Sequence, residues 1–297
     1  MAMVELQIKG GHRPCTMRLD LDPANPNEAI LINHLFRGLF YEPDTSRIFT
    51  RVLREGDTVI DVGGNCGYFA MLAAALVGPN GRVVTFEPDP ANCERLRGNI
   101  ALNGFTNVIL VEQPALESVR PVTFYINDEN SGGDALWNSG ELPDHSEATR
   151  TLSLTGTTLD IEIARLGLDN IKLVKVDTEG ADHMVLQGAG ELLRGGKVPF
   201  YLCELHEFAL GKMGTSQAGF RDYMADFGYD TFAVMFDGSL PHMVPRRTRI
   251  DSQFICNMLF TRGAELAPYW PVHQQNPGDL YGNPGDVVVS ATDLRFG

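Results

Sequence analysis

Two kinds of hydrophobic pattern alternate along the chain from Gly56 onward. Short apolar runs rich in Val, Ile and Phe are separated by longer segments whose apolar residues recur at helical spacing. The short runs are typical of strands buried on both faces, and the longer segments are typical of helices with one buried face. Their alternation predicts βαβ units around a parallel sheet. We therefore expect a doubly wound, mostly parallel, Rossmann-like α/β fold.

The expected elements follow from these runs. Strands are predicted over residues 58–61, 82–86, 107–111, 171–177 and 199–204. Helices are predicted over residues 68–77, 90–102, 181–193 and 217–227. Two later apolar runs, 231–236 and 253–260, are expected to complete the sheet as an antiparallel edge pair.

The same pattern divides the chain into a cover segment, a main domain and a tail. A predicted strand over 4–8 and helical spacing over 29–40 indicate an N-terminal cover. The βαβ rhythm breaks over 119–155, where the chain is polar, glycine-rich and too long for an ordinary connection. Such an insert is either functional, for example a lid over a site, or a disordered surface loop. The expected boundaries are 1–55 for the cover, 56–263 for the domain and 264–297 for the Pro- and Gly-rich tail.

The charge and the cysteines narrow the class of partner. The formal net charge is −14, and no cluster of basic residues is denser than Arg246, Arg247 and Arg249, so nucleic acid is a poor partner. The first residues lack the apolar core of a signal peptide, and no apolar run approaches the roughly 20 residues of a membrane span. We expect a cytoplasmic protein that binds neither nucleic acid nor membrane. The five cysteines are widely spaced without a CxxC pair, which indicates reduced thiols.

A glycine-rich turn between the first predicted strand and helix is the sharpest local signal. The strand ends at Asp61, the helix begins near Tyr68, and three glycines lie between them: Gly63, Gly64 and Gly67. Glycines at this point allow a tight turn and let a ligand approach a helix N-terminus. The dinucleotide fingerprint does not fit, because Asn65 or Cys66 occupies the place of its second glycine. A Walker A loop is excluded, because no Gly-Lys-Ser/Thr follows.

An acidic residue at the end of the next predicted strand is the second signal. Glu87 follows Gly67 by 20 positions. A carboxylate at such a strand end can accept hydrogen bonds from both hydroxyls of a ribose. Each signal alone also occurs without a ligand, but their order and spacing together predict a nucleoside-type ligand.

At this point the ordered motifs resemble those of the FkbM family of S-adenosylmethionine-dependent methyltransferases, over residues 39–262. The matching positions are Tyr41 and Glu42; Asp61, Gly63, Asn65 and Gly67, with Gly64 where alanine is usual; Glu87 and Pro88; Ala115 and Leu116; Ser131–Gly133; Thr158–Asp160; Lys175–Gly180; and Glu204 with His206. The resemblance implies a methyltransferase sheet that binds S-adenosylmethionine. It also implies O-methylation of a small molecule, sugar or natural product.

The resemblance assigns the site residue by residue. The implied cofactor-binding residues are Glu42, Asp61, Gly63, Gly64, Asn65, Gly67, Glu87, Pro88, Asp89, Ala115 and Asp177. Among these, the glycine turn would hold the methionine part, Glu87 the ribose, and Asp89 with Ala115 would neighbour the adenosine. We further expect Ser131, Gly132, Trp137, Glu179 and His206 to bind the acceptor, with the loop around Trp137 as its lid.

Four polar residues at two predicted strand ends are the candidates for chemistry: Asp177, Glu179, Glu204 and His206. Residues two apart on an extended chain point the same way, so all four converge if the strands are neighbours, as the resemblance implies. His206 titrates nearest neutral pH and is the expected base, with Asp177 orienting the acceptor or cofactor and Glu204 as a further catalytic candidate.

Simpler roles for these four residues stay open. Asp177 or Glu179 can cap the following helix, and His206 can be a hydrogen-bonded structural residue. The set can also hold a divalent metal ion, although methyl transfer needs none, so we expect metal independence. Lys175 lies between apolar residues and is expected to be paired or at a strand edge rather than to act as a nucleophile. Two rival functions remain: a non-catalytic, cofactor-binding regulator and a nucleotide-dependent oxidoreductase.

Overall fold

The fold is that of a computed structural model. It describes residues 2–9, 11–127, 131–138, 140, 148, 150–248, 250 and 256–270, and the backbone of 287–293. Parts of the expected insert (128–130, 139, 141–147 and 149) and of the expected tail (271–286 and 294–297) lie outside the described residues. So does the start of the second expected edge strand, 253–255, with the two residues before it.

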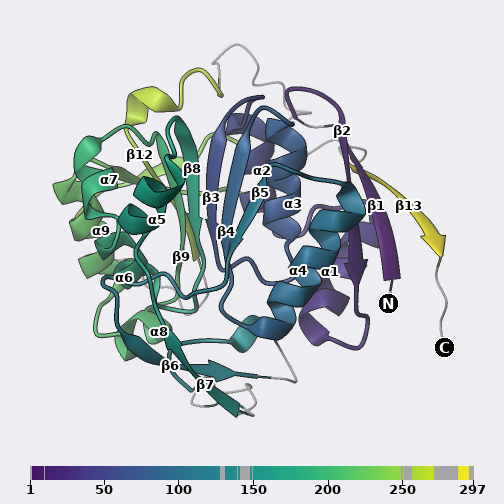
Figure 1. The fold of residues 1–297 in the computed structure, drawn as a ribbon. Coiled ribbons are helices and arrows are strands. Elements are labelled where there is room, and N and C mark those ends of the chain that lie inside the picture. The colour runs from purple at the N-terminus through teal and green to yellow at the C-terminus, as the bar shows by residue number, and fades with distance from the viewer. Residues whose placement is uncertain are drawn as a thin grey trace.

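A mostly parallel sheet forms the centre of the molecule (Figure 1). Its parallel strands are β3 (Thr58–Val62), β4 (Arg82–Phe86), β5 (Val108–Val111), β8 (Ile171–Val176) and β9 (Phe200–Leu205). The sheet order is β11-β10-β12-β9-β8-β3-β4-β5. Strands β10 (Asp230–Ala233) and β12 (Cys256–Thr261) are antiparallel, which confirms the predicted fold class and edge pair. A short extra strand, β11 (His242–Val244), pairs with β10.

Helices cover both faces of this sheet, and alternate strand residues build a separate core on each face. One core joins Val59, Val83 and Leu173 to α2 (Pro43–Val52) and α3 (Tyr68–Val77). The other joins Ile60, Val84 and Val174 to helices of the opposite face. Those helices are α5 (Leu159–Leu166), α6 (Asp182–Gln187), α7 (Gly190–Gly195), α8 (Glu207–Lys212) and α9 (Gln217–Asp226). This arrangement follows from side chains that alternate across each strand.

One predicted helix is divided in two. The expected helix over 181–193 is present as α6 and α7, with Gly188 at the break. A Cβ atom at Gly188 would lie 1.9 Å from the carbonyl oxygen of Leu116, so the neighbouring loop approaches the backbone at this point. The helical spacing of apolar residues over 181–193 does not predict this contact with a distant loop.

An N-terminal sheet covers α3 and α4 (Pro90–Asn103) on the side away from the central sheet. Strands β1 (Ala2–Ile8) and β2 (Cys15–Leu21) pair antiparallel, and β13 (Val287–Asp293) adds to β1. Between two sheets, α3 is buried at all ten of its residues. Helix α1 (Pro26–Phe36) begins before residue 29, where helical spacing was predicted to start. The Asn25 side chain caps it and proline occupies its first position.

The expected insert contains a β-hairpin that projects below the central sheet in Figure 1. It is formed by β6 (Pro121–Ile126) and β7 (Arg150–Thr155). A short 3₁₀ helix, Ser131–Gly133, begins the part that we call the arm segment, residues 131–138. A second 3₁₀ helix, Gly263–Glu265, follows β12. No helix in the described part of the chain is long and apolar enough to cross a membrane.

Candidate active site

A cavity of about 400 Å³ lies where β3, β4, β8 and β9 end. Most of the residues expected to bind the cofactor line it: Glu42, Gly63, Gly64, Asn65, Glu87, Pro88, Ala115 and Asp177. Three others, Asp61, Gly67 and Asp89, do not line it. Of the remaining candidates, Ser131, Gly132, Glu179 and Glu204 line the cavity, whereas Trp137 and His206 do not. The topology therefore gathers most, but not all, of the predicted site.

The glycine turn is held tightly between two strand ends. Gly63 has a φ of +88°, and a Cβ atom there would lie 1.9 Å from the carbonyl oxygen of Asp177. The backbone N–H groups of Gly63 and Gly64 both donate to the carbonyl oxygen of Phe86, at 3.0 and 2.9 Å. Gly67 has a φ of +96° and caps α3. The turn thus needs glycine for its backbone shape and for its contact with β8.

Glu87 follows the last residue of β4 and lines the cavity. Its two carboxylate oxygens accept the backbone N–H groups of Asn65 and Asp89, at 2.7 and 2.8 Å. Burial raises the pKa of Glu87 to about 7, although these two hydrogen bonds oppose the shift. Each oxygen keeps a further lone pair for a ligand hydroxyl. Asp89 instead caps α4 through the N–H of Asn92 and pairs with Arg150.

A buried lysine lies beneath the other end of the cavity. The Nζ atom of Lys175 is 2.9 Å from Oδ2 of Asp177 and 3.9 Å from Oδ1 of Asp61, and 4.7 Å from the centre of the Phe69 ring. Burial lowers the pKa of Lys175, but the carboxylates of Asp177, Asp61 and Glu42 outweigh burial and leave it raised. Lys175 is therefore a paired cation, the first of its two expected roles, and Asp61 contacts Lys175 rather than the cavity.

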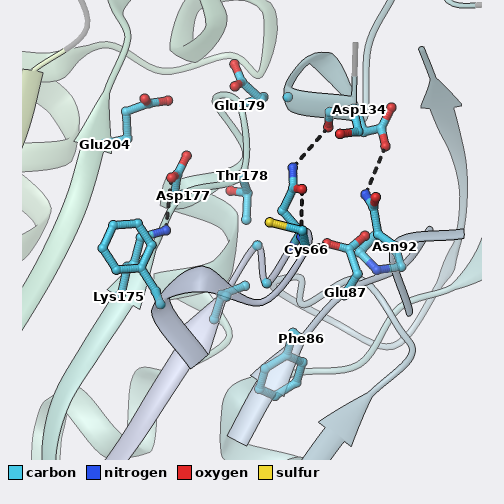
Figure 2. Close-up of a pocket in the computed structure, with 18 of the residues that line it drawn as sticks. Cys66, Phe86, Glu87, Asn92, Asp134, Lys175, Asp177, Thr178, Glu179 and Glu204 are labelled. Carbon is cyan, nitrogen blue, oxygen red and sulfur yellow. Dashed lines mark hydrogen bonds and ion pairs between the residues drawn. The ribbon is translucent and has the colours of Figure 1, made fainter. Parts of the chain in front are cut away.

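Three carboxylates meet above this lysine: Asp177, Glu179 and Glu204, called here the carboxylate cluster (Figure 2). One oxygen from each lies within 4.8 Å of the others. Burial, followed by the charge of Asp177, raises the pKa of Glu179 and Glu204 well above the ordinary glutamate value. The Oε2 atom of Glu204 is buried without a hydrogen-bond partner among the described residues. It can accept a proton or a donor group from a ligand.

Glu42 lies close enough to the carboxylate cluster to interact with its charges. It precedes α2 with a φ of +40°, a conformation uncommon for a residue with a side chain. Burial and the charge of Asp177 raise its pKa to about 7.

The three oxygen atoms of the carboxylate cluster could also hold a divalent ion at this separation, although Lys175 already supplies a cation to Asp177.

His206 lies outside this arrangement because the chain turns at the end of β9. Strand β9 ends at Leu205 and α8 begins at Glu207, so His206 is the N-cap residue between them. Glu179 reaches the cluster by a different route from the one predicted. Strand β8 ends at Val176, and Glu179 has a left-handed backbone with a φ of +52°. Strand alternation therefore does not describe residues beyond the strand ends.

The far side of the cavity contains Glu87 and two polar residues, Asn92 and Asp134, that the strand-end argument did not assign. Figure 2 shows Glu87, Asn92 and Asp134 on this side, across from the carboxylate cluster. Burial raises the pKa of Asp134 to about 8. Asp134 accepts the N–H of Asn127 at 2.8 Å and lies 3.5 Å from Nδ2 of Asn92. In the sequence, only the position of Asp134 in the polar insert pointed to a role at the site.

Cys66 also lines the cavity, with a pKa raised to about 12 by burial, which keeps the thiol protonated.

Comparison with known proteins shows which family this chain is similar to. A family model described as the methyltransferase FkbM domain matches residues 61–231. The 31-O-demethyl-FK506 methyltransferase FkbM of Streptomyces tacrolimicus is 34% identical over 184 residues, which are 50% of this chain and 67% of that protein. The methyltransferase sdnD of Sordaria araneosa is 28% identical over 159 residues, which are 45% of this chain and 60% of that protein.

A solved structure is also similar. The crystal structure of the methyltransferase FkbM from Methylobacillus flagellatus matches with a TM-score of 0.45 and 13% sequence identity. The match covers 72% of this chain and 50% of that one, so the chain spans half the length of that protein.

Proposed function

The chain belongs to the FkbM methyltransferase domain family, and from that premise we propose that it transfers a methyl group from S-adenosylmethionine to a hydroxyl of a small molecule. The observation that carries this proposal is the cavity at the strand ends, with Glu87 on one side and the carboxylate cluster on the other. Two relatives support it by name, since each is a methyltransferase and one is named for a demethylated FK506.

The residues present fit S-adenosylmethionine. The cavity volume of about 400 Å³ is in the range that binds small molecules. Glu87 offers free lone pairs for a ribose, and Phe86, Pro88 and Ala115 offer apolar wall for a base. The excess of carboxylates around Lys175 favours a cationic ligand. When bound, the cofactor supplies an activated methyl group on a positively charged sulfur.

Glu204 is the proposed base for the acceptor hydroxyl. Asp177 is hydrogen-bonded to Lys175, so its charge is already engaged, whereas Oε2 of Glu204 has no partner in the described part of the chain. A carboxylate whose pKa is raised accepts a proton more readily than an ordinary one. Glu204 would take the proton that the acceptor hydroxyl loses when the methyl group moves from the cofactor sulfur to the acceptor oxygen. Glu179 and Asp177 hold the acceptor in place.

The charge of the walls limits the class of acceptor. The carboxylates of Glu42, Glu87 and Asp134 add to those of the cluster, and Lys175 is the only lysine or arginine among the lining residues that the structure describes. An anionic acceptor would find no free cation among these lining residues to bind it, and its charge would oppose ionisation of the acidic groups around it. The proposed acceptor is therefore an uncharged or cationic hydroxyl compound. Phosphodiester chains are disfavoured for the same reason.

Two alternatives remain testable. A non-catalytic regulator would bind S-adenosylmethionine without consuming it, and a nucleotide-dependent oxidoreductase would bind NAD. The diphosphate of NAD has no arginine and no unpaired lysine to contact in the described cavity wall. We also propose that transfer is independent of metal, because methyl transfer needs no metal and Lys175 already contributes a cation to the cluster.

The test is mass-spectrometric detection of S-adenosylhomocysteine with a panel of hydroxylated small molecules that differ in charge. The proposal predicts product with uncharged or cationic acceptors, little with anionic ones, and the same turnover after chelation. Binding of S-adenosylmethionine without product across the panel would favour the regulator. Loss of turnover on chelation, restored by magnesium or manganese, would assign the carboxylate cluster to a metal.

A further inference from the structure

The turn that follows β8 has a backbone shape that needs outside support. Glu179 adopts a φ of +52°, and Gly180 follows with a φ of +95°. The left-handed conformation is disfavoured for a residue with a side chain, and it persists only where neighbouring groups fix it. In this turn it directs the carboxylate of Glu179 toward Asp177 and Glu204. The contacts around the turn therefore decide whether the carboxylate cluster forms.

Two elements hold the turn from its far side. The buried carboxylate of Asp182 accepts the hydroxyl of Thr178 at 3.0 Å and the N–H of Gly180 at 3.3 Å. Helix α8 packs against Gly180, where a Cβ atom would lie 2.5 Å from the carbonyl carbon of Ala209. These contacts fix the positions before and after Glu179 but leave its own carbonyl group to another partner.

That partner is an indole from the arm segment. The Nε1–H group of Trp137 donates to the carbonyl oxygen of Glu179 at 2.8 Å. Trp137 is 7% exposed, and its ring centre lies 5.9 Å from that of Phe208 on α8. Trp137 does not line the cavity. It thus touches the backbone of a cluster residue without reaching the place where ligands bind.

The arm segment also reaches the glycine turn on the other side of the cavity. The side-chain amide of Asn65 donates to the carbonyl oxygen of Ser131 at 3.3 Å. The amide of Asn25, next to α1, donates to the hydroxyl of Ser131 at 3.1 Å. One short segment therefore joins the turn expected to hold the cofactor to the turn that carries Glu179.

We infer that Trp137 is a positioning residue: its indole N–H fixes the left-handed turn at Glu179 and so places the Glu179 carboxylate against the acceptor. Without this hydrogen bond the carbonyl of Glu179 loses its partner, and the turn relaxes toward an ordinary backbone conformation. The carboxylate then leaves the cluster, although no group that contacts the ligand has been removed. The inference rests on the proposed function, because the acceptor is what Glu179 holds.

A pair of variants distinguishes the effect of losing the Trp137 hydrogen bond from the effect of losing its ring packing. Trp137→Phe keeps an aromatic ring and removes the N–H donor, whereas the control Phe208→Leu keeps the donor and reduces the ring contact. We expect Trp137→Phe to lower kcat about three- to tenfold, the scale of one lost hydrogen bond, with unchanged calorimetric affinity for S-adenosylmethionine. Phe208→Leu should leave kcat unchanged. In a Glu179→Gln background, Trp137→Phe should cause no further loss, because both changes act through one carboxylate.

A crystal structure of Trp137→Phe decides the positioning role without any acceptor. The inference predicts that the Glu179 carboxylate leaves Asp177 and Glu204, while an unchanged Glu179 turn would overturn it. Additive losses in the Glu179→Gln background would overturn it as well. If the Phe variant does not fold, benzothienylalanine at position 137 keeps the bicyclic shape without the N–H and takes its place. If the wild-type protein methylates nothing, the proposed function fails, yet the structural comparison still tests the role of Trp137.

Discussion

Gly63 lies so close to the carbonyl oxygen of Asp177 that no side chain fits at its position. A Cβ atom would lie 1.9 Å from that oxygen, and the φ of +88° is strained for any other residue. We expect Gly63→Ala to lower the free energy of unfolding by roughly 2–5 kcal/mol, from backbone strain and overpacking together. Urea unfolding measures this loss.

The matched control for Gly63 is Gly98, on α4. A Cβ atom at Gly98 meets nothing within 4 Å, and the residue is helical. Gly98→Ala should therefore raise the free energy of unfolding by up to about 1 kcal/mol. Equal effects of the two substitutions would show that the glycine turn has room that the structure does not give it.

Glu87 carries the prediction for cofactor affinity. Its carboxylate organises the turn through Asn65 and Asp89 and faces the cavity. Glu87→Ala should cost about 1.5–3 kcal/mol of binding free energy for S-adenosylmethionine, the scale of a charged hydrogen bond. Isothermal titration calorimetry measures it, with the exposed Glu94→Ala as a control for replacing a glutamate on the same side of the sequence motif. Unchanged affinity in Glu87→Ala would place the ribose elsewhere.

At the scale of elements, the ends of β8 and β9 set the pH dependence of the reaction. Burial and the charge of Asp177 raise the pKa of Glu204, and a general base acts only when it is unprotonated. We therefore expect kcat to rise with pH over a range well above the ordinary titration of glutamate, at about 4.3. A rate profile measured from acid to alkaline pH tests this. A rate that follows the ordinary titration of glutamate would exclude Glu204 as the base.

The strand ends also mark where prediction from the sequence stopped. Glu87 and Gly63 could be placed at the cavity from the sequence because each lies close to one strand-to-helix turn. Glu179 was predicted to converge with Asp177 by strand alternation, but the strand ends before both of them. It converges through a left-handed turn whose shape depends on distant contacts with Trp137 and α8. No local pattern encodes contacts of that kind.

Some strands could be predicted from the sequence, and others could not. The βαβ rhythm predicted the parallel strands and the antiparallel pair, because buried strands have a strong apolar signal. The N-terminal strand β2 was missed, although Met17, Leu19 and Leu21 alternate with more exposed residues. β2 pairs with β1 as a local hairpin within residues 2–21, whereas β13 joins β1 from almost the other end of the chain. The addition of β13 is a property of the folded molecule rather than of any short window.

For the molecule as a whole, buried acids predict how stability depends on pH. Burial raises the pKa of Asp61 to about 6, of Glu87 and Asp182 to about 7, and of Asp134 to about 8. Each folded-state pKa exceeds that of the unfolded chain, so the stabilising protonated form is lost as pH rises through the folded-state value. The net charge of −14 adds self-repulsion over the same range.

The unliganded protein should therefore lose thermal stability as the pH rises from about 5 to about 8. Differential scanning calorimetry across this range measures the trend. Asp182→Asn removes one of the titrating groups and should flatten the fall. A melting temperature that increases with pH would mean that these carboxylates are ionised and well paired in the folded protein.

The initial rate of S-adenosylhomocysteine formation, measured in parallel for the wild-type protein, Glu204→Gln and His206→Ala, tests the chemistry of the site most directly. Glu204 lines the cavity with a buried, unpartnered oxygen, whereas His206 lies outside it. Glu204→Gln should lower the rate about 10²-fold or more with the affinity for S-adenosylmethionine preserved, and His206→Ala should stay near the wild-type rate. A normal rate in Glu204→Gln together with a lost rate in His206→Ala would contradict a carboxylate base.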